Sequence, residues 1–293
     1  MKNINIFCFG FGQVAKSFLT KIDLENYNIN LSTTSRNETS KKNFNGINYQ
    51  NYFLNGEKYD QDLISNLKKS DHILISIPPI EGSDIVVKMF SKFIENSNIK
   101  WVTYLSATSV YGNHDGEWVD EKSKNKPTSQ NGIDRLEAEN SWLSLKIKCN
   151  LPIQIFRLSG IYSNKNNILN RLQIGTAKLV NKKNHFFSRV HVDDIGNILY
   201  KSLTKFKEGE IYNISDDKPS SSEEIILYAA KLLNIKNIKK IEIENLENPM
   251  LKNFYKDSKK VNNKKMKEFF NYKLKFPTYI EGLNYIRDNF IKL

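Results

Sequence analysis

Near its N-terminus the chain has glycines at a spacing that suits the binding of a dinucleotide. A strand-like apolar segment runs into Gly10-Phe11-Gly12-Gln13-Val14-Ala15, which follows the pattern G-x-G-x-x-A, and a helical pattern comes next. Gly10 permits a tight turn, Gly12 lets the backbone approach a pyrophosphate, and Ala15 allows close packing of helix on strand. The alternative is an ordinary glycine-rich turn, but the order strand, turn, helix is the one this mechanism requires. The motif predicts a dinucleotide site that includes Gln13 and Val14 at the start of the helix.

The end of the second expected strand is where NAD and NADP are usually distinguished. The segment Ser32 to Asn37 contains no carboxylate that could accept hydrogen bonds from the ribose 2′-hydroxyl. Thr34 and Ser35 offer hydroxyl groups there, and Arg36 offers a guanidinium that suits a 2′-phosphate. The alternative is a surface arginine in a polar loop. We therefore expect NADP as the cofactor, with NAD as the second choice.

Several later segments form an ordered set of motifs. They are residues 105–112, Leu-Ser-Ala-Thr-Ser-Val-Tyr-Gly, then Pro127 and residues 131–139, and finally residues 156–162, 189–195 and 211–215. In this order, from the first strand to about residue 216, they resemble the extended short-chain dehydrogenases/reductases, the NAD-dependent epimerase/dehydratase family. The first segment is similar to the active-site strand of that family, the second to the helix that follows it, and the others to its later signature segments.

The resemblance implies an NAD(P)-dependent oxidoreductase or epimerase/dehydratase. Its reaction would be hydride transfer at a carbonyl or carbinol carbon of a small, sugar-nucleotide-like substrate. The resemblance also implies a catalytic region that contains Ser106, Thr108, Tyr111, Asn131 and Arg135. Ile77 and Pro78, from a Ser-Ile-Pro-Pro segment found in a poorly characterised subgroup, and again Arg135 join the expected cofactor-binding residues.

The chain departs from the family at the residues that handle the proton. The family has Ser or Thr, then Tyr and Lys, where this chain has Ala107, Asn131 and Arg135, and the first glycine of the family's turn falls on Phe9. An amide such as Asn131 cannot exchange a proton. Arg135 can hold a ribose and keep a positive field, but it stays protonated and is no base. The sequence therefore predicts an altered active site.

Other side chains are candidates for the missing roles. Ser106 and Thr108 could polarise a carbonyl group, while the nearby titratable residues are Tyr111, Asp134 and His114. Tyr111 could equally be a packing residue at the strand end. Two low-ranked substrate residues are Tyr162 and Arg157, of which Arg157 could hold an anionic substrate or brace the C-terminal part. His191 alternates with apolar residues, so we expect a structural histidine before a helix capped by Asp193 or Asp194.

The elements that must position these residues follow a βαβ rhythm. Near-continuous apolar strands indicate a parallel sheet that is covered on both faces. The expected strands are 3–9, 28–33, 72–77, 101–105 and 152–156, and the expected helices are 14–21, 60–69, 83–96 and 130–145. This predicts an α/β fold, a Rossmann-like doubly wound parallel sheet with a smaller C-terminal substrate cap.

The pattern loosens after Tyr162, and this predicts the domain organisation. We expect an NAD(P)-binding domain over residues 1–162, to which 191–216 return, and a mixed cap over 163–293. The cap would contain a helix near 168–180, a strand over 186–192 and a helix around 223–233 with Ser221 or Ser222 as its N-cap. A helix from Asp194 and a strand over 210–214 complete the pattern.

Composition limits the class of protein. The chain has 293 residues, 39% hydrophobic and 26% charged, with a net charge of +12 and two cysteines, Cys8 and Cys149, without metal-ligand spacing. No apolar run reaches the roughly 18 residues of a membrane helix, and no secretory signal is visible. We expect a cytoplasmic protein with buried reduced thiols and no metal site. The lysines are spread along the chain, which favours a solvated surface over a nucleic-acid partner.

Two alternatives stay open at this stage. Apolar residues on 83–96, together with the helix 130–145, could form a homodimer contact of the kind the resemblance implies, or could pack on the sheet. The loss of the tyrosine and lysine also permits a second function, a catalytically weak or inactive NADP(H)-binding sensor or scaffold.

Overall fold

The computed structural model describes residues 1–180, 182, 184–247 and 255–291. The chain forms two compact units, and neither is continuous in sequence. Unit 1 comprises Met1–Ala107, Ile133–Arg157 and Ile195–Tyr212, and unit 2 comprises Thr108–Gly132, Leu158–Asp194 and Asn213–Leu293.

A mostly parallel sheet organises unit 1. Its strand order is β13-β9-β7-β6-β1-β2-β4-β3, with β5 paired to β4. The strands are β1 Lys2–Phe9, β2 Tyr27–Ser35, β3 Ser40–Phe44, β4 Ile47–Asn55, β5 Lys58–Tyr59, β6 His72–Ile75, β7 Trp101–Ala107, β9 Ile153–Leu158 and β13 Ile211–Ile214. Strand β1 pairs in parallel with both β2 and β6, so the order reverses there, as in a doubly wound fold. The Rossmann-like fold predicted from the sequence is confirmed.

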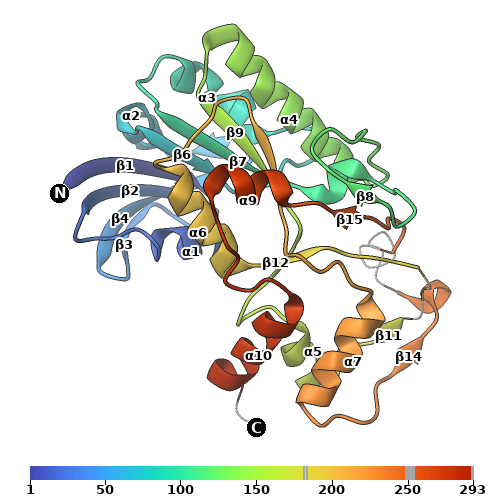
Figure 1. Cartoon of the computed structure of the whole chain (residues 1–293). Coiled ribbons are helices and arrows are strands. Elements are labelled where there is room, and N and C mark those ends of the chain that lie inside the picture. The colour runs from blue at the N-terminus through green and yellow to red at the C-terminus, as the bar shows by residue number, and fades with distance from the viewer. Residues whose placement is uncertain (181, 183, 248–254, 292–293) are drawn as a thin grey trace. The chain divides into compact units, whose positions relative to one another are not determined.

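Helices cover both faces of this sheet (Figure 1). Helices α2 Asp62–Lys69, α3 Ile85–Glu95 and α4 Gln130–Cys149 lie on one face, and α1 Gln13–Leu19 and α6 Val192–Ser202 on the other. The core under α2, α3 and α4 contains fully buried aromatic side chains, among them Phe7, Phe9, Phe90 and Trp142. Asp84 starts α3 because its carboxylate accepts hydrogen bonds from the backbone N–H groups of Val86 and Val87.

The apolar stripe on α3 packs on the sheet. Val86 and Phe90 are fully buried in the core, and Val87 and Phe93 are partly buried against it. Burial within the chain therefore accounts for these four residues. A homodimer stays a prediction.

A polar hairpin in unit 1 was not predicted from the sequence. Strands β3 and β4 pair antiparallel around Asn45 and Gly46, both at positive φ (49° and 80°). The strand β3 consists largely of exposed lysine and other polar residues, so it lacks the apolar alternation used to find strands. The Asn-Gly pair between the two strands is the signal that could have found the hairpin.

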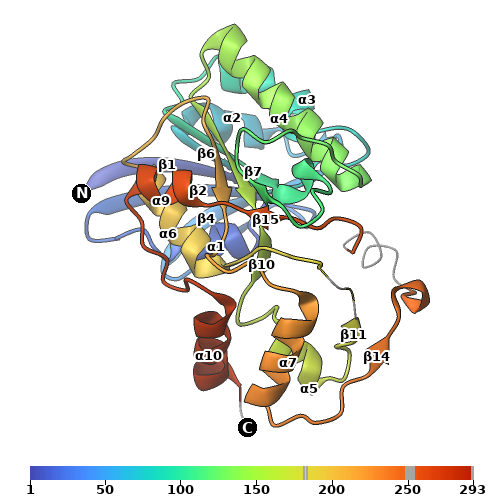
Figure 2. The same cartoon turned by 45° about the vertical axis from the view of Figure 1, so that its right-hand side comes forward.

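In unit 2, helices surround a small apolar core of their own. Helices α5 Ile168–Gln173, α7 Ser222–Leu232 and α10 Tyr279–Phe290 pack around it, with α9 Lys264–Phe270 elsewhere in the unit (Figure 2). Three short parallel pairs accompany them: β10 Gly160–Tyr162 with β12 Arg189–His191, β11 Leu179–Val180 with β14 Lys240–Ile241, and β8 Trp118–Val119 with β15 Lys260–Val261. The described part of the unit also contains two 3₁₀ turns, η1 Thr108–Tyr111 and η2 Ile243–Asn245.

Two sequence predictions for this part of the chain were wrong, and one is confirmed. The helix expected over 168–180 ends at Gln173, Gly175 follows at φ 69°, and β11 occupies the remainder. Helix α6 begins at Val192, so neither Asp193 nor Asp194 is its N-cap. Asp194 instead accepts hydrogen bonds from the Tyr272 hydroxyl and two backbone N–H groups. Ser221 does cap α7, since its hydroxyl accepts from the Glu224 N–H.

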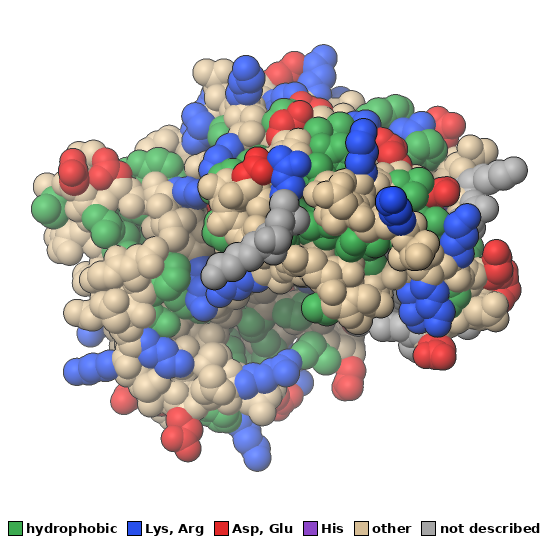
Figure 3. Space-filling model, turned by 90° about the horizontal axis from the view of Figure 1, so that it is seen from below, with side chains coloured by type: hydrophobic (Ala, Val, Ile, Leu, Met, Phe, Trp, Pro, Cys, Tyr) green, Lys and Arg blue, Asp and Glu red, His purple; other side chains and the backbone are tan. Residues whose placement is uncertain are grey.

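Three properties of the described residues can be compared with expectation. Across the described residues, every helix is too short or too polar to span a bilayer. Lysine and arginine side chains are scattered over the face seen in Figure 3 rather than gathered in one patch, as the sequence pattern indicated. Both thiols are free; Cys8 is buried and Cys149 is half-buried.

The turn at Gly112 generates a stability prediction. Gly112 has φ 67°, and a Cβ there would lie 1.8 Å from the carbonyl oxygen of Lys126. Gly46 is a matched control, because it has φ 80° and no atom within 4 Å of a Cβ. We expect Gly112→Ala to lower the free energy of unfolding by about 3–5 kcal/mol, and Gly46→Ala by about 1 kcal/mol from backbone strain alone. Urea unfolding measures both, and equal losses would contradict the packing at Gly112.

Candidate functional site

The glycine turn in unit 1 is held by the two neighbouring strands. Gly10 has φ 85°, and a Cβ there would lie 2.8 Å from Cγ2 of Ile77. The Gly10 N–H donates to Oγ1 of Thr34, at 3.0 Å. The structure therefore brings together Gly10, Thr34 and Ile77, three of the residues expected at the cofactor site. Pro78, next to Ile77, is exposed.

Gly12 leaves open space at the start of α1. It is the N-cap residue of that helix, and no protein atom lies within 4 Å of a Cβ placed there. Within α1, Val14 and Ala15 are buried, whereas Gln13 is exposed. The backbone at Gly12 is open to a ligand, and the helix is closely packed at Ala15. Both features suit the binding of a dinucleotide pyrophosphate.

Of Thr34, Ser35 and Arg36 at the end of β2, Arg36 is the most exposed. The Thr34 hydroxyl accepts from Gly10, and the Ser35 hydroxyl accepts from the Asn51 side chain at 2.9 Å. Arg36 is exposed. A 2′-phosphate at this place would therefore meet a guanidinium rather than two open hydroxyl groups.

An aromatic and cationic cluster beside the turn was missed by the sequence analysis. The ring of Phe11 contacts those of Phe44 and Tyr49, with centroids 5.4 and 5.1 Å away. The Lys16 ammonium lies 5.7 Å from the centre of the Phe11 ring. Phe44 and Tyr49 flank the unpredicted Asn-Gly turn, so this cluster could be found only after that hairpin.

A buried ion pair lies at the end of β7. Arg157 donates from Nη2 to Oε2 of Glu139 at 2.6 Å and from Nε to both carboxylate oxygens at 3.1 and 3.2 Å. The Ser106 hydroxyl donates to Oε1 of the same carboxylate at 2.5 Å. Relative exposures are 2% for Ser106, 1% for Glu139 and 2% for Arg157.

This arrangement changes the interpretation of two predicted site residues. Arg157 was expected to hold a substrate or to brace the C-terminal part, but its guanidinium is buried against Glu139. Ser106 was expected to polarise a carbonyl, but its hydroxyl is donated to that carboxylate. The signal in the sequence was an acidic residue on the apolar face of an amphipathic helix, next to Ala138 and one turn before Trp142.

Arg135 lies on the same helix, at the carboxyl end of β7. Its Nη1 donates to the carbonyl oxygen of Leu105 at 2.6 Å, and the side chain is half-buried. Burial raises the pKa of the Tyr104 hydroxyl, and the positive charge of Arg135 opposes that rise. The charge that Arg135 keeps is compatible with the role of holding a ribose.

The remaining catalytic candidates of the sequence belong to unit 2. Tyr111 is fully buried, and its hydroxyl donates to Oδ1 of Asn213 at 2.7 Å, which favours the packing role. Thr108 is half-buried in η1, and Asn131 is exposed in the first turn of α4. Nε2 of His114 lies 3.1 Å from the Tyr111 carbonyl oxygen, so this ring stabilises the loop.

His191 behaves as the structural residue that was expected. It is 3% exposed, and its Nδ1 accepts a hydrogen bond from the Asp193 N–H at 3.2 Å. Its ring packs on those of Tyr162 and Phe276, with centroids 5.1 and 4.1 Å away.

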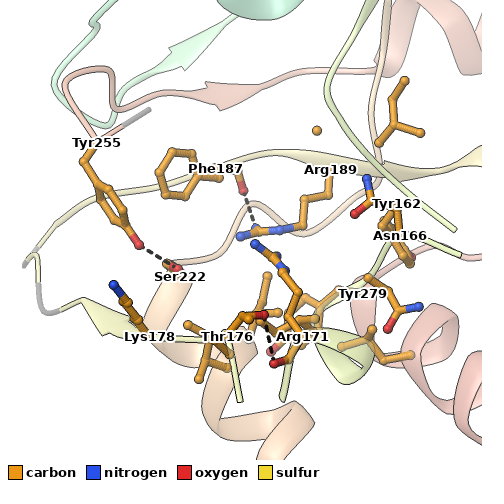
Figure 4. A pocket seen from close by; sticks show the side chains of 18 of the residues that line it. Tyr162, Asn166, Arg171, Thr176, Lys178, Phe187, Arg189, Ser222, Tyr255 and Tyr279 are labelled. Carbon is orange, nitrogen blue, oxygen red and sulfur yellow. Dashed lines mark hydrogen bonds between the residues drawn. The ribbon is translucent and has the colours of Figure 1, made fainter. Parts of the chain in front are cut away.

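Unit 2 also contains a pocket of about 910 Å³ that the sequence did not reveal. Its walls come from β10, α5, β12, α7 and α10 and include the predicted substrate residue Tyr162. Three cations, Arg171, Lys178 and Arg189, line it, as Figure 4 shows. The lining residues come from separate segments between Gly160 and Leu283 and carry no motif.

Comparisons with known proteins give the fold family. No protein-family model and no curated protein matches the chain. A solved structure of a conserved protein of unknown function from Silicibacter pomeroyi is 30% identical over 99% of both chains, with a TM-score of 0.85. UDP-glucose 4-epimerase from Thermotoga maritima, solved with UDP-glucose, is 14% identical over 98% of both chains, with a TM-score of 0.79. dTDP-glucose 4,6-dehydratase from Bacillus anthracis, solved with NAD, is 19% identical over 98% of this chain and 96% of its own, with a TM-score of 0.75.

The buried ion pair generates a second stability prediction. Glu139→Ala removes the carboxylate that forms a buried ion pair with Arg157, so the buried guanidinium loses this opposing charge. We expect a loss of about 3–5 kcal/mol in the free energy of unfolding. Glu137→Ala, at an exposed position on the same helix, should change it by less than about 0.5 kcal/mol. Similar effects of the two variants in chemical denaturation would refute the ion pair as a major contributor.

Proposed function

This chain belongs to the family of the Silicibacter pomeroyi protein and has the fold of the extended short-chain dehydrogenases/reductases, and from that premise we propose that it is an NAD(P)-dependent oxidoreductase or epimerase/dehydratase. The reaction is hydride transfer at a carbonyl or carbinol carbon of a small, sugar-nucleotide-like substrate. The observation that carries the proposal is the turn at Gly10 and Gly12, closed on its inner side by Ile77 and Thr34 and open at Gly12. UDP-glucose in one neighbour and NAD in another support the same class of reaction.

In this proposal, residues of unit 1 bind three parts of the cofactor: the pyrophosphate, the 2′-phosphate and the nicotinamide ribose. The backbone at Gly12 and the start of α1 receives the pyrophosphate, and Arg36 receives the 2′-phosphate of NADP. Arg135 holds the nicotinamide ribose from the end of β7, where its guanidinium already contacts the Leu105 carbonyl. The nicotinamide ring, when bound, supplies or accepts the hydride.

The proton requires a group that the family's usual pattern does not provide here. Asn131 and Ala107 cannot donate one, and the hydroxyls of Ser106 and Tyr111 already donate to Glu139 and Asn213. Of the sequence candidates, Thr108 is the hydroxyl that stays half-exposed. We expect slow turnover, because Asn131 and Arg135 stand where the family has the tyrosine and lysine that exchange the proton.

The same observations favour one other function, an NADP(H)-binding sensor or scaffold without turnover. Oxidation of NADPH in the presence of carbonyl and nucleotide-sugar compounds separates the two. Measurable turnover excludes the sensor. Absence of turnover, combined with protection of the chain from proteolysis that differs between NADPH and NADP⁺, supports it.

We further propose that unit 1 binds the nucleotide and that the C-terminal part binds the substrate, as the sequence-based domain boundaries imply. A cytoplasmic location, a homodimer and the absence of a nucleic-acid partner stay predictions.

Gly12→Ala is the sharpest test of the cofactor site. The new Cβ meets no protein atom and φ is −83°, so the melting temperature should change little. The methyl group would occupy the space of the pyrophosphate, and we expect dinucleotide affinity to fall on the order of tenfold or more in calorimetric titration. Unchanged affinity in a folded variant would reject the site. Gly10→Ala is the contrasting control, because its Cβ meets Ile77 and stability itself should fall.

Arg36→Ala tests the choice of cofactor. With a guanidinium and no carboxylate at the end of β2, the unmodified chain should bind NADPH at least about tenfold more tightly than NADH, a gap of roughly 1.4 kcal/mol. The variant should lose most of that difference, whereas Lys69→Ala, an exposed cation at the end of α2, should keep it. Equal affinities for NADPH and NADH in the unmodified chain would show the NADP assignment to be incorrect.

A further inference from the structure

The turn that carries Gly10 and Gly12 has one side chain between its two glycines, that of Phe11. A glycine backbone has more conformational freedom than any other, so a Gly-x-Gly turn loses much entropy when it is fixed in one conformation. Thr34 and Ile77 restrict the turn at Gly10. At Gly12, in contrast, no protein atom lies within 4 Å of a Cβ placed there. The packing of Phe11 is therefore the contact that orders the turn beyond Gly10.

Phe11 is anchored on the β3–β4 hairpin. Its ring meets that of Phe44 edge-on, at an interplanar angle of 86°, with centroids 5.4 Å apart, and the Tyr49 ring lies 5.1 Å away. The Lys16 ammonium, from α1, lies 5.7 Å from the centre of the Phe11 ring and 5.9 Å from that of Phe44. All three rings are half-buried. Edge-to-face and cation–π contacts add to the gain from burial, so the hairpin and α1 together hold the Phe11 ring.

The hairpin stands where a crossover helix would usually be. Adjacent parallel strands are mostly joined by a helix that packs on the sheet. Strands β2 and β4 are parallel neighbours, but residues 36–46 between them contain β3, which pairs antiparallel with β4. The steps from β1 to β2 and from β2 to β4 run in the same direction, so a right-handed crossover would put that helix on the face of α1. The hairpin does lie beside α1 (Figure 1).

The same face of the hairpin also holds the end of β2. Asn51 lies two residues after Tyr49 on β4, and side chains two apart on a strand point to the same face. Asn51 is 2% exposed, accepts a hydrogen bond from Oγ1 of Thr33 at 3.1 Å and donates one to Oγ of Ser35 at 2.9 Å. The hairpin therefore contacts two parts of the expected cofactor site, the glycine turn and the end of β2.

We propose that the β3–β4 hairpin is a positioning element: Phe44 and Tyr49 hold Phe11 and thereby keep the glycine turn in the conformation that receives a dinucleotide. The two are positioning residues, which act through Phe11 without touching the ligand. A turn that is already ordered loses less entropy on binding, so its affinity is higher. By reciprocity, a bound dinucleotide stabilises the hairpin. That the ligand is a dinucleotide rests on the proposed function, but the ordering of the turn does not.

Hydrogen exchange in the ligand-free chain tests the ordering of the turn. The probe is the Gly10 N–H, which donates to Thr34 at 3.0 Å and is followed by NMR. Phe44→Ala should speed its exchange about three- to tenfold, the effect of losing an aromatic pair. Tyr49→Ala should act in the same way, whereas Tyr49→Phe keeps the ring and should exchange as the unmodified chain does. An unchanged rate in the alanine variants overturns the inference.

Two further variants separate this contact from a general loss of stability. Phe93, on α3, is also a half-buried ring with a lysine ammonium nearby, at 5.4 Å, but it lies on the other face of the sheet. Phe93→Ala should lower the melting temperature and leave the exchange of Gly10 unchanged. In a Phe11→Ala background, Phe44→Ala should have no further effect, because the contact is already lost. Equal acceleration by Phe93→Ala, or additive effects of the Phe11 and Phe44 variants, contradicts the proposal.

Calorimetric titration with NADPH tests the effect on binding. Phe44→Ala should weaken binding about three- to tenfold, and Phe93→Ala should leave it unchanged. NADPH should in turn slow amide exchange over residues 40–49 of the unmodified chain. If the unmodified chain binds no nicotinamide dinucleotide, the proposed function fails, and the exchange of Gly10 in the ligand-free chain still decides this inference. If NADPH binds equally well to Phe44→Ala and to the unmodified chain, the inference fails and the proposed function stands.

Discussion

The buried ion pair of Glu139 with Arg157 is the interaction on which the functional edge of unit 1 depends. It joins α4 to β9, and through the Ser106 hydroxyl it joins both to β7. Two charges inside a protein require close mutual hydrogen bonding to offset the loss of water. The pair is therefore one constraint on how α4 packs on the sheet, and Arg135, one turn earlier on the same helix, contacts the end of β7.

Several side chains that the sequence analysis proposed for catalysis have structural partners instead. Side chains that could assist a carbonyl are engaged in holding the structure: Ser106 with Glu139, Tyr111 with Asn213, and His114 with backbone carbonyl oxygens. The cofactor turn, in contrast, keeps an open backbone at Gly12. Nucleotide binding therefore has stronger structural support than proton transfer does.

The sequence predicted what depends on local pattern. Apolar runs predicted β1, β2, β6, β7 and β9 of the sheet, and G-x-G-x-x-A predicted the turn that Thr34 and Ile77 hold. It could not predict that Glu139 and Arg157 pair, since each alone is an ordinary charged residue. The cationic pocket was also invisible, because Arg171, Lys178 and Arg189 meet only when α5, β11 and β12 have assembled. The β3–β4 hairpin was missed for a different reason. Strand β3 is polar and lacks apolar alternation, so the Asn-Gly pair was not recognised as a turn between two strands.

The discontinuity of the two units has a consequence for how the chain folds during synthesis. In the sheet of unit 1, β7 lies beside β9, and β9 lies beside β13. Strand β7 therefore lacks one neighbour until β9 has been made, and β9 lacks one until β13 has been made. Until residues 153–158 and 211–214 leave the ribosome, the backbone of the growing sheet presents an unpaired edge. Such edges are sites of aggregation, and pairing over long sequence separations is slow. Chaperone protection of nascent chains therefore matters most between the completion of β7 and that of β13.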